Sequence, residues 1–224
     1  MESVAEALAA QCGGAQRIEL CADLAVGGLT PNADLTRAVR GQIHLPIFAM
    51  IRPRGGDFVY SDAEFELMRG SVATAKELGM DGLVLGLLTR ERRVDVERTR
   101  ELVELARPLP VTFHRAFDES VDLAAALEDV IASGAARILT SGGAPTAPEG
   151  VATLAKLVAA AGNRIIILPG SGINATNIAQ VMQTRAREFH SGLSSALGRP
   201  TTDHDAFTEN VRQLADDLSK NSST

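Results

Sequence analysis

Short apolar runs alternate with longer stretches of helical periodicity along almost the whole chain. Alternation of this kind is typical of βα units that build a parallel sheet. An amphipathic helix is expected first, from Glu2 to Cys12. The apolar runs then predict seven strands: Arg17–Ala22, Ile47–Pro53, Gly82–Leu88, Val111–Phe117, Arg137–Ser141, Arg164–Pro169 and Glu188–Ser191.

Capping residues mark the ends of several predicted helices. The stretch SDAE from Ser61 to Glu64 is a capping box. Other N-cap candidates are Asp95, Asp122 and Asn174, and candidate helix-ending glycines are Gly79, Gly134 and Gly162. The segments GAQRIEL, GMDGLVL and GAARILT repeat one order of helix end, short loop and strand. This repeat predicts an α/β fold, a single TIM-type (β/α)8 barrel over residues 1–224, with a doubly wound sheet as the alternative.

The strand count is one short of eight, because the chain opens directly with a helix. We therefore expect a barrel that lacks its first strand and leaves two sheet edges unpaired. Either the natural start lies upstream of Met1, or a partner subunit of a homo-oligomer covers the gap. The polar residues from about 220 to 224 are expected to form a tail.

Composition narrows the classes of function. A net charge of −6 and a pI near 5.3 argue against nucleic acid as a partner, since phosphate backbones need a basic face. The chain carries no apolar run of membrane-spanning length, so no membrane association is expected. The two cysteines, Cys12 and Cys21, are too few for a disulfide framework and predict free thiols in the cytoplasm.

The first candidate site follows the second predicted strand, in the segment from Arg52 to Asp57 (RPRGGD). Two guanidiniums, at Arg52 and Arg54, and two glycines suit the recognition of a carboxylate or phosphate, and Asp57 is included among the candidate residues of this site. The alternative is a structural loop in which Arg54 pairs with Asp57 at the surface.

The second candidate site combines a titratable imidazole, His114, with Arg115 as an anion ligand and Asp118 as an orienting carboxylate. Strand alternation points Glu19, Arg52 and His114 into the barrel, and the same parity applies to Met50, His190 and Cys21. His114 and Glu19 are thus candidates for acid–base catalysis, with Asp118 supporting. The alternative is that Glu19 and Arg52 only form a buried ion pair.

The third candidate site consists of two glycine-bearing loops near the end of the chain. TIM barrels often hold a substrate phosphate on such loops, where a following helix offers free N–H groups. The anion-binding candidates here are Thr140, Ser141, Gly142, Gly143, Gly170, Gly172 and His190.

Several long motifs together resemble the CutC family: RIELCADLAVGGLTP, FAMIRPRGGDFVYSDAEFE, PLPVTFHRAFD, RILTSGG and REFHSG. The resemblance covers about Ala7 to His190 and implies a TIM-type barrel, a cytoplasmic location and a role in copper homeostasis. Family members usually carry a first strand similar to ExCxD, which is missing here together with its cysteine.

Two hypotheses follow. Cu(I) prefers thiolate and thioether ligands with imidazole as a third, so Cys21, Met50 and His114 are the candidate metal ligands, and weak Cu(I) binding is expected. The alternative is an enzyme of unassigned reaction that acts on a small anionic or phosphorylated substrate. The hard, charged groups predicted inside the barrel favour this second hypothesis.

Overall fold

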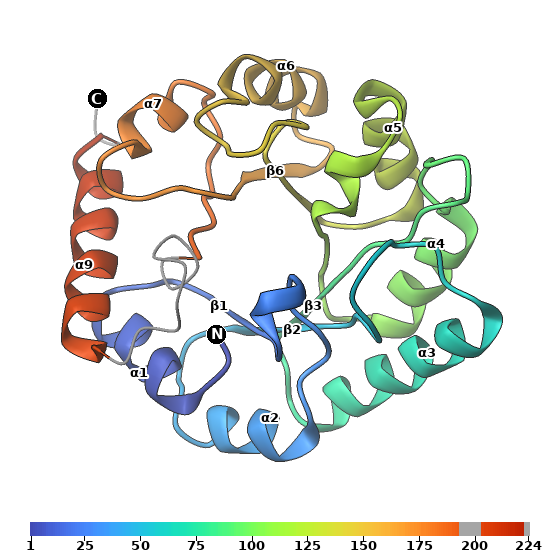
Figure 1. The fold of residues 1–224 in the computed structure, drawn as a ribbon, viewed down its shortest axis with the longest axis horizontal. Coiled ribbons are helices and arrows are strands. Elements are labelled where there is room, and N and C mark those ends of the chain that lie inside the picture. Colours follow the sequence, from blue (N-terminus) through green and yellow to red (C-terminus); the bar gives the residue numbers. More distant parts are fainter. Residues whose placement is uncertain (193–202, 222–224) are drawn as a thin grey trace.

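The computed structural model describes residues 1–192 and 203–221. In this part of the chain, six parallel strands pair in chain order and curl into a barrel wall that is ringed by helices (Figure 1). The strands are β1 (Ile18–Leu20), β2 (Ile47–Met50), β3 (Gly82–Leu85), β4 (Val111–Phe113), β5 (Arg137–Thr140) and β6 (Ile166–Pro169). The predicted TIM-type arrangement is confirmed.

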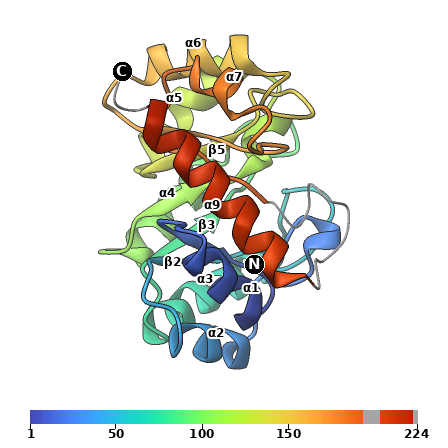
Figure 2. The same cartoon turned by 90° about the vertical axis from the view of Figure 1, so that its left-hand side faces the viewer.

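A helix follows each strand and packs on the outside of the sheet. The helices are α1 (Val4–Cys12), α2 (Ala33–Arg40), α3 (Asp62–Glu77), α4 (Val96–Ala106), α5 (Leu123–Ser133), α6 (Val151–Ala161), α7 (Ile178–Met182) and α9 (His204–Asn221), with 3-10 turns η1 (Leu24–Val26) and η2 (Arg115–Glu119). The last helix, α9, packs against α1 and α7, so the first and last helices of the chain lie side by side (Figure 2). α9 continues to Asn221, and residues 222–224 of the expected tail lie outside the described residues. None of the helices that the structure describes is long and apolar enough to cross a membrane.

Most of the predicted helix caps are present. Ser61 and Glu64 form the reciprocal capping box, and the Asp95 and Asp122 side chains accept N–H groups of the first turn of α4 and α5. Asn174 is a wrong assignment, because the N-cap of α7 is Asn177. The Asn174 Oδ1 instead accepts the backbone N–H of Thr176 in a local turn that precedes the helix.

Strand alternation separates two cores. Ile18 and Leu20 belong to the large core between the sheet and the helices. A smaller cluster lies inside the barrel and contains Cys21, Phe48, Met50 and Val84. Residues of alternate parity thus face opposite sides of the sheet, as expected. The carboxyl ends of β2 and β4 bring the polar clusters to one face of the barrel.

The predicted seventh strand, Glu188–Ser191, is wrong. This segment runs beside β6 but makes a single backbone hydrogen bond to it, from the His190 N–H to the Pro169 carbonyl at 2.9 Å. A β-strand requires a series of backbone hydrogen bonds to its neighbour, and one such bond is not enough. On the other side of the gap, the outer edge of β1 pairs with Met1, whose ammonium donates to the Glu19 carbonyl at 2.8 Å and whose carbonyl accepts the Cys21 N–H at 3.0 Å.

Candidate functional site

His114 lies directly after β4 and is buried. Its Nδ1 accepts the backbone N–H of Ala116 at 3.2 Å, so the proton of the neutral ring must reside on Nε2. Burial, reinforced by the positive charge of Arg52, lowers the pKa of His114 to about 3. The Nε2–H has no partner among the described residues. The imidazole is therefore neutral at physiological pH and presents an Nε2–H donor, while its Nδ1 lone pair already accepts the Ala116 N–H.

Gly86 makes room for this imidazole. A Cβ added at Gly86, on the neighbouring loop after β3, would lie 2.5 Å from the His114 Nδ1. That distance is far inside van der Waals contact, so a side chain at this position would displace the ring. The requirement was missed from the sequence, where Gly86 reads only as an interruption of an apolar strand.

Arg52 lies directly beyond the end of β2 and is only 5% exposed. Its guanidinium donates to three backbone carbonyls: Val26 at 2.8 Å, Gly28 at 3.4 Å and Gly56 at 2.9 Å. No carboxylate in the described ranges pairs with it, so the expected alternative of an ion pair with Glu19 is not formed. The Arg52 Nε–H has no acceptor there either. Within the described part of the chain, this cation is thus buried without a counter-ion, which is costly.

Phe58 joins Arg52 to His114. The Arg52 Cζ lies 4.8 Å from the centre of the Phe58 ring, and the imidazole centre lies 4.9 Å from the same ring. The buried Tyr60 O–H donates to no group among the described residues. Burial raises the pKa of Tyr60, and the charge of Arg52 together with its weak hydrogen bond to the Tyr60 oxygen acts in the opposite direction. We refer to Arg52, Phe58, Tyr60 and His114 as the Arg52 cluster.

Arg54 and Asp57 have a structural arrangement. Arg54 donates to Asp57 Oδ1 at 2.8 Å, to Glu64 Oε1 at 2.5 Å and to the carbonyls of Gly55, Asp57 and Val59. These bonds use all five N–H groups of a guanidinium. Asp57 in turn accepts the Val59 N–H, and its pair with Arg54 keeps its pKa below the ordinary value. The surface pairing considered as the alternative is the one observed, and neither side chain is free to bind an anion.

Asp118 does not contact His114, which corrects its expected orienting role. Its carboxylate accepts the Thr140 hydroxyl, the Ser141 N–H at 3.0 Å, the Gly143 N–H at 2.9 Å and the Arg115 Nε–H at 2.9 Å. Arg115 also donates to the Ser141 Oγ at 2.9 Å, and the Gly142 N–H donates to Thr140 Oγ1 at 2.8 Å. The loop expected to bind an external anion therefore already holds an internal one.

The loop after β6 offers fewer free N–H groups for an anion than the sequence predicts. The Gly170 N–H donates to the Thr140 carbonyl at 3.0 Å and is part of the sheet. Gly172 adopts φ +72° and its carbonyl accepts the Asn177 side-chain amide at 2.8 Å. The helix that follows, α7, has only five residues, so its dipole is small.

Glu19 and His190 meet inside the barrel, where the Glu19 Oε2 lies 3.9 Å from the His190 Nδ1. Both side chains are partly exposed. Neither makes a hydrogen bond or ion pair with Arg52 or His114 in the described chain. The four polar residues expected to converge thus divide into two groups: Glu19 faces His190, whereas Arg52 and His114 both contact Phe58.

Cys21 and Met50 lie side by side in the barrel interior. A Cβ added at Gly28 would be 3.4 Å from the Cys21 Sγ and 3.5 Å from the Met50 Cε. Burial raises the pKa of Cys21, although the Met1 ammonium acts in the opposite direction, so the thiol is neutral at pH 7. Within residues 1–192 and 203–221, no group of three or more His, Cys, Asp or Glu side chains could hold a metal ion. Cys12 is exposed.

An unexpected charged network closes the opposite end of the barrel. Glu188 accepts from Arg17 at 2.9 Å and from Arg137 at 2.8 Å, and both guanidiniums lie over Phe48, at 5.0 and 5.6 Å from its ring centre. Burial acts to raise the pKa of Glu188, but the hydrogen bonds from Arg137 and Arg17 outweigh it and lower the pKa. In the sequence, Arg17 directly precedes β1 and Arg137 begins β5, and arginines at these two strand starts were the signal that could have indicated the network.

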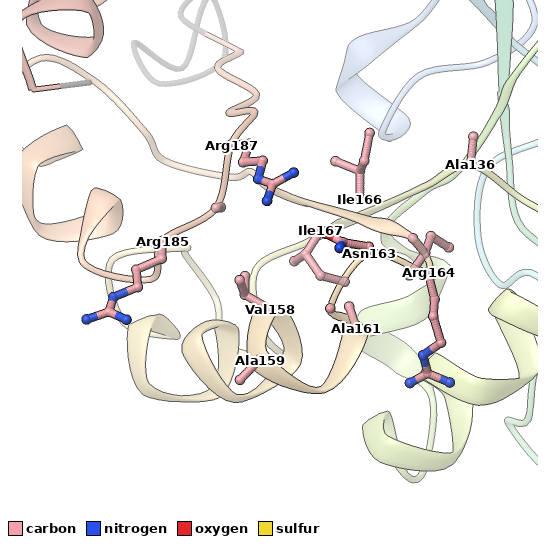
Figure 3. Close-up of a pocket in the computed structure, with 13 residues that line it drawn as sticks. Ala136, Val158, Ala159, Ala161, Asn163, Arg164, Ile166, Ile167, Arg185 and Arg187 are labelled. Atoms are coloured by element: carbon pink, nitrogen blue, oxygen red, sulfur yellow. The ribbon is translucent and has the colours of Figure 1, made fainter. Parts of the chain in front are cut away.

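A groove of about 850 Å³ also opens at this opposite end. It lies between α6, the starts of β5 and β6, and residues 185–187, with Arg164, Arg185 and Arg187 among its lining residues (Figure 3). None of the candidate site residues lines this groove. It is therefore separate from the polar clusters at the carboxyl ends of the strands.

The fold and these clusters define a TIM-type α/β barrel with a buried, charge-unbalanced site at the carboxyl ends of its strands. The chain belongs to the CutC family, whose model matches residues 1–195. A family protein CutC from Xylella fastidiosa is 50% identical over 196 residues, which cover 87% of this chain and 73% of that relative. The human copper homeostasis protein cutC homolog is 45% identical over 196 residues, which cover 87% of this chain and 72% of the relative.

A solved structure supports the same assignment. The crystal structure of the protein CutC from Streptococcus agalactiae superposes with a TM-score of 0.75 at 36% sequence identity. The match covers 83% of this chain and 90% of that chain.

Proposed function

We propose that this CutC-family barrel binds a small anion at the Arg52 cluster. The observation that carries the proposal is the Arg52 guanidinium, which is buried without a carboxylate partner in the described part of the chain. Desolvating a cation is costly, and backbone carbonyls together with one aromatic ring offset only part of that cost. A bound anion supplies the missing charge.

Two further donors support an anion at this place. The His114 Nε2–H and the Tyr60 O–H are both buried and donate to no group among the described residues. A planar guanidinium also matches the geometry of a carboxylate or phosphate better than an ammonium does. The separate Glu19 and His190 pair is the candidate for proton transfer if the bound anion is a substrate, since the low pKa of His114 makes it a poor base.

The test is isothermal titration calorimetry with a panel of small anions on the wild type, Arg52→Gln and Arg54→Gln. Both variants replace an arginine of the same loop, but Arg54 has all its donors engaged by protein groups. We expect Arg52→Gln to lose binding and Arg54→Gln to retain it. Equal binding by all three proteins would refute a site at Arg52.

Copper is a second candidate, favoured by the proximity of Cys21 and Met50, which belong to one cluster in the barrel interior and both lie next to Gly28. A thiol and a thioether are the donor types that Cu(I) prefers, so the residues fit the ion. The neutral state of the thiol and the lack of a third clustered ligand in the described chain predict weak binding, because Cu(I) must displace the Cys21 proton.

Competition with a Cu(I) chelator tests the copper candidate. We expect weak binding that Cys21→Ser removes, with Cys12→Ser as the matched control that leaves it unchanged. Tight, stoichiometric binding that survives Cys21→Ser would contradict the assignment of this ligand.

A further inference from the structure

The Arg52 cluster also indicates which class of anion it accepts, an inference that rests on the anion-binding function proposed above. Its charge is the first argument. The other arginines that directly follow β2 and β4 are neutralised by carboxylates: Arg54 by Asp57 and Glu64, and Arg115 by Asp118. Arg52 leaves one unbalanced positive charge. A carboxylate carries one negative charge, whereas a phosphate group attached to carbon carries about 1.5 to 2 at pH 7.

The supply of donors is the second argument. A phosphate presents three acceptor oxygens and is usually held by a run of backbone N–H groups. The glycine loop best suited to this task, Thr140–Gly143, is filled by Asp118, whose carboxylate accepts the Ser141 and Gly143 N–H groups. Asp118 is thus a carboxylate of the protein itself in the place of an external phosphate.

The donors that remain around Arg52 match a different ligand. The Arg52 guanidinium has five N–H groups, and its three carbonyl acceptors engage at most three of them. The Nε–H is one of the N–H groups that remain without a partner in the described chain. Two N–H groups suffice for the two oxygens of one carboxylate. The His114 Nε2–H is a single neutral donor, suited to a carbonyl or hydroxyl oxygen that carries no charge.

We propose that the ligand is a small monocarboxylate with a second, uncharged oxygen acceptor. Arg52 binds the carboxylate and His114 donates Nε2–H to the carbonyl or hydroxyl oxygen. The Phe58 ring, which contacts both side chains, forms an apolar wall between them.

Two glycine loops control access to these donors. The guanidinium is enclosed by the carbonyls of Val26, Gly28 and Gly56, and a Cβ added at Gly55 would lie 3.1 Å from the Val26 Cβ. The loops therefore touch at Val26 and Gly55. A ligand enters by parting this contact, which involves no covalent connection and no ion pair.

The experiment compares three probes on the wild-type chain by calorimetry: pyruvate, acetate and inorganic phosphate. We expect pyruvate to bind about fivefold more tightly than acetate, the effect of one added neutral hydrogen bond, and phosphate to bind more weakly than either. His114→Phe, which keeps a flat ring but removes the donor, should reduce pyruvate binding to the level of acetate. Arg52→Gln should abolish the binding of both carboxylates.

Each other outcome contradicts a specific step. Equal affinities of the wild type for pyruvate and acetate would overturn the role of His114, even if His114→Phe does not fold. Phosphate binding that depends on Arg52, without carboxylate binding, would overturn the ligand class and leave the anion site standing. If no probe binds, or if binding is unaffected by Arg52→Gln, the proposed function itself fails.

Discussion

Replacing Asp118 by Ala should destabilise this protein far more than a typical loop substitution. The Asp118 carboxylate is the common acceptor for donors of two neighbouring loops, and its side chain is only 7% exposed. Without it, the donors at Gly143 and Arg115 can turn to water, because both residues are partly or fully exposed. Thr140 and Ser141 are completely buried and cannot.

The magnitude follows from these two buried residues. Leaving a buried donor unsatisfied costs about 1 to 3 kcal/mol, so the Thr140 hydroxyl and the Ser141 N–H together predict a loss of about 4 kcal/mol. For a chain of this size that loss corresponds to a decrease in Tm of about 8 to 16 °C. Urea denaturation at neutral pH measures the free energy of unfolding, and calorimetry gives the Tm.

Asp122→Ala is the matched control, because Asp122 lies four residues further on and also accepts backbone N–H groups. As an exposed N-cap of α5, it should contribute about 1 kcal/mol. A second result should distinguish the two variants: acetate or phosphate should stabilise Asp118→Ala more than Asp122→Ala, because only Asp118→Ala offers a vacated loop that the anion can fill in addition to the Arg52 cluster. If Asp118→Ala costs no more than Asp122→Ala and gains no more than Asp122→Ala from either anion, the role assigned to Asp118 is refuted.

Three further predictions concern charged and titratable groups. Glu188→Gln should lower the free energy of unfolding by about 2 kcal/mol, because it leaves the guanidiniums of Arg17 and Arg137 without their carboxylate. In the same urea titration, Glu128→Gln at the exposed pair with Arg164 should have a clearly smaller effect. The pKa of His114 is about 3 in the folded chain against 6.5 for the free side chain, so the unfolded state binds more protons between these values and stability falls as the pH drops below about 6.5. His114→Asn should remove this part of the pH dependence, which reaches at most about 1.4 kcal/mol per pH unit; parallel slopes for wild type and variant between pH 7 and 5 would contradict it. In thiol labelling with a disulfide reagent, Cys12 should react in the native protein and Cys21 only after unfolding; rapid labelling that survives Cys12→Ser would show that Cys21 is accessible.

Much of the fold could be predicted because it depends on local patterns. Apolar runs located the six strands to within a few residues, and side-chain caps such as Ser61 with Glu64 located helix starts. The predicted strands extended too far where polar residues follow an apolar run. Phe117, for example, is buried like a strand residue but belongs to the 3-10 turn η2, because its segment bends around His114.

The site was less predictable because it depends on which groups satisfy one another across the fold. Period-two alternation correctly placed Cys21 with Met50 inside the barrel. It could not show that Asp118 fills a loop 22 to 25 residues away in the sequence. A loop with free N–H groups binds a carboxylate of its own chain and an external anion in the same way, so the sequence of the loop does not distinguish the two. The distances among Arg52, Phe58 and His114 likewise depend on how loops from β2 and β4 meet.

The most direct test of the central claim is to observe the Arg52 Nε–H itself by ¹H–¹⁵N NMR during a titration with pyruvate. Its resonance can be assigned by its absence from Arg52→Lys, and Arg54 in the same loop supplies an internal reference. The anion-binding account predicts a saturable shift of the Arg52 Nε–H signal with little change at Arg54, whose donors are all engaged. An Arg52 signal that stays unchanged while pyruvate binds, or a chain that binds no anion at all, would contradict it.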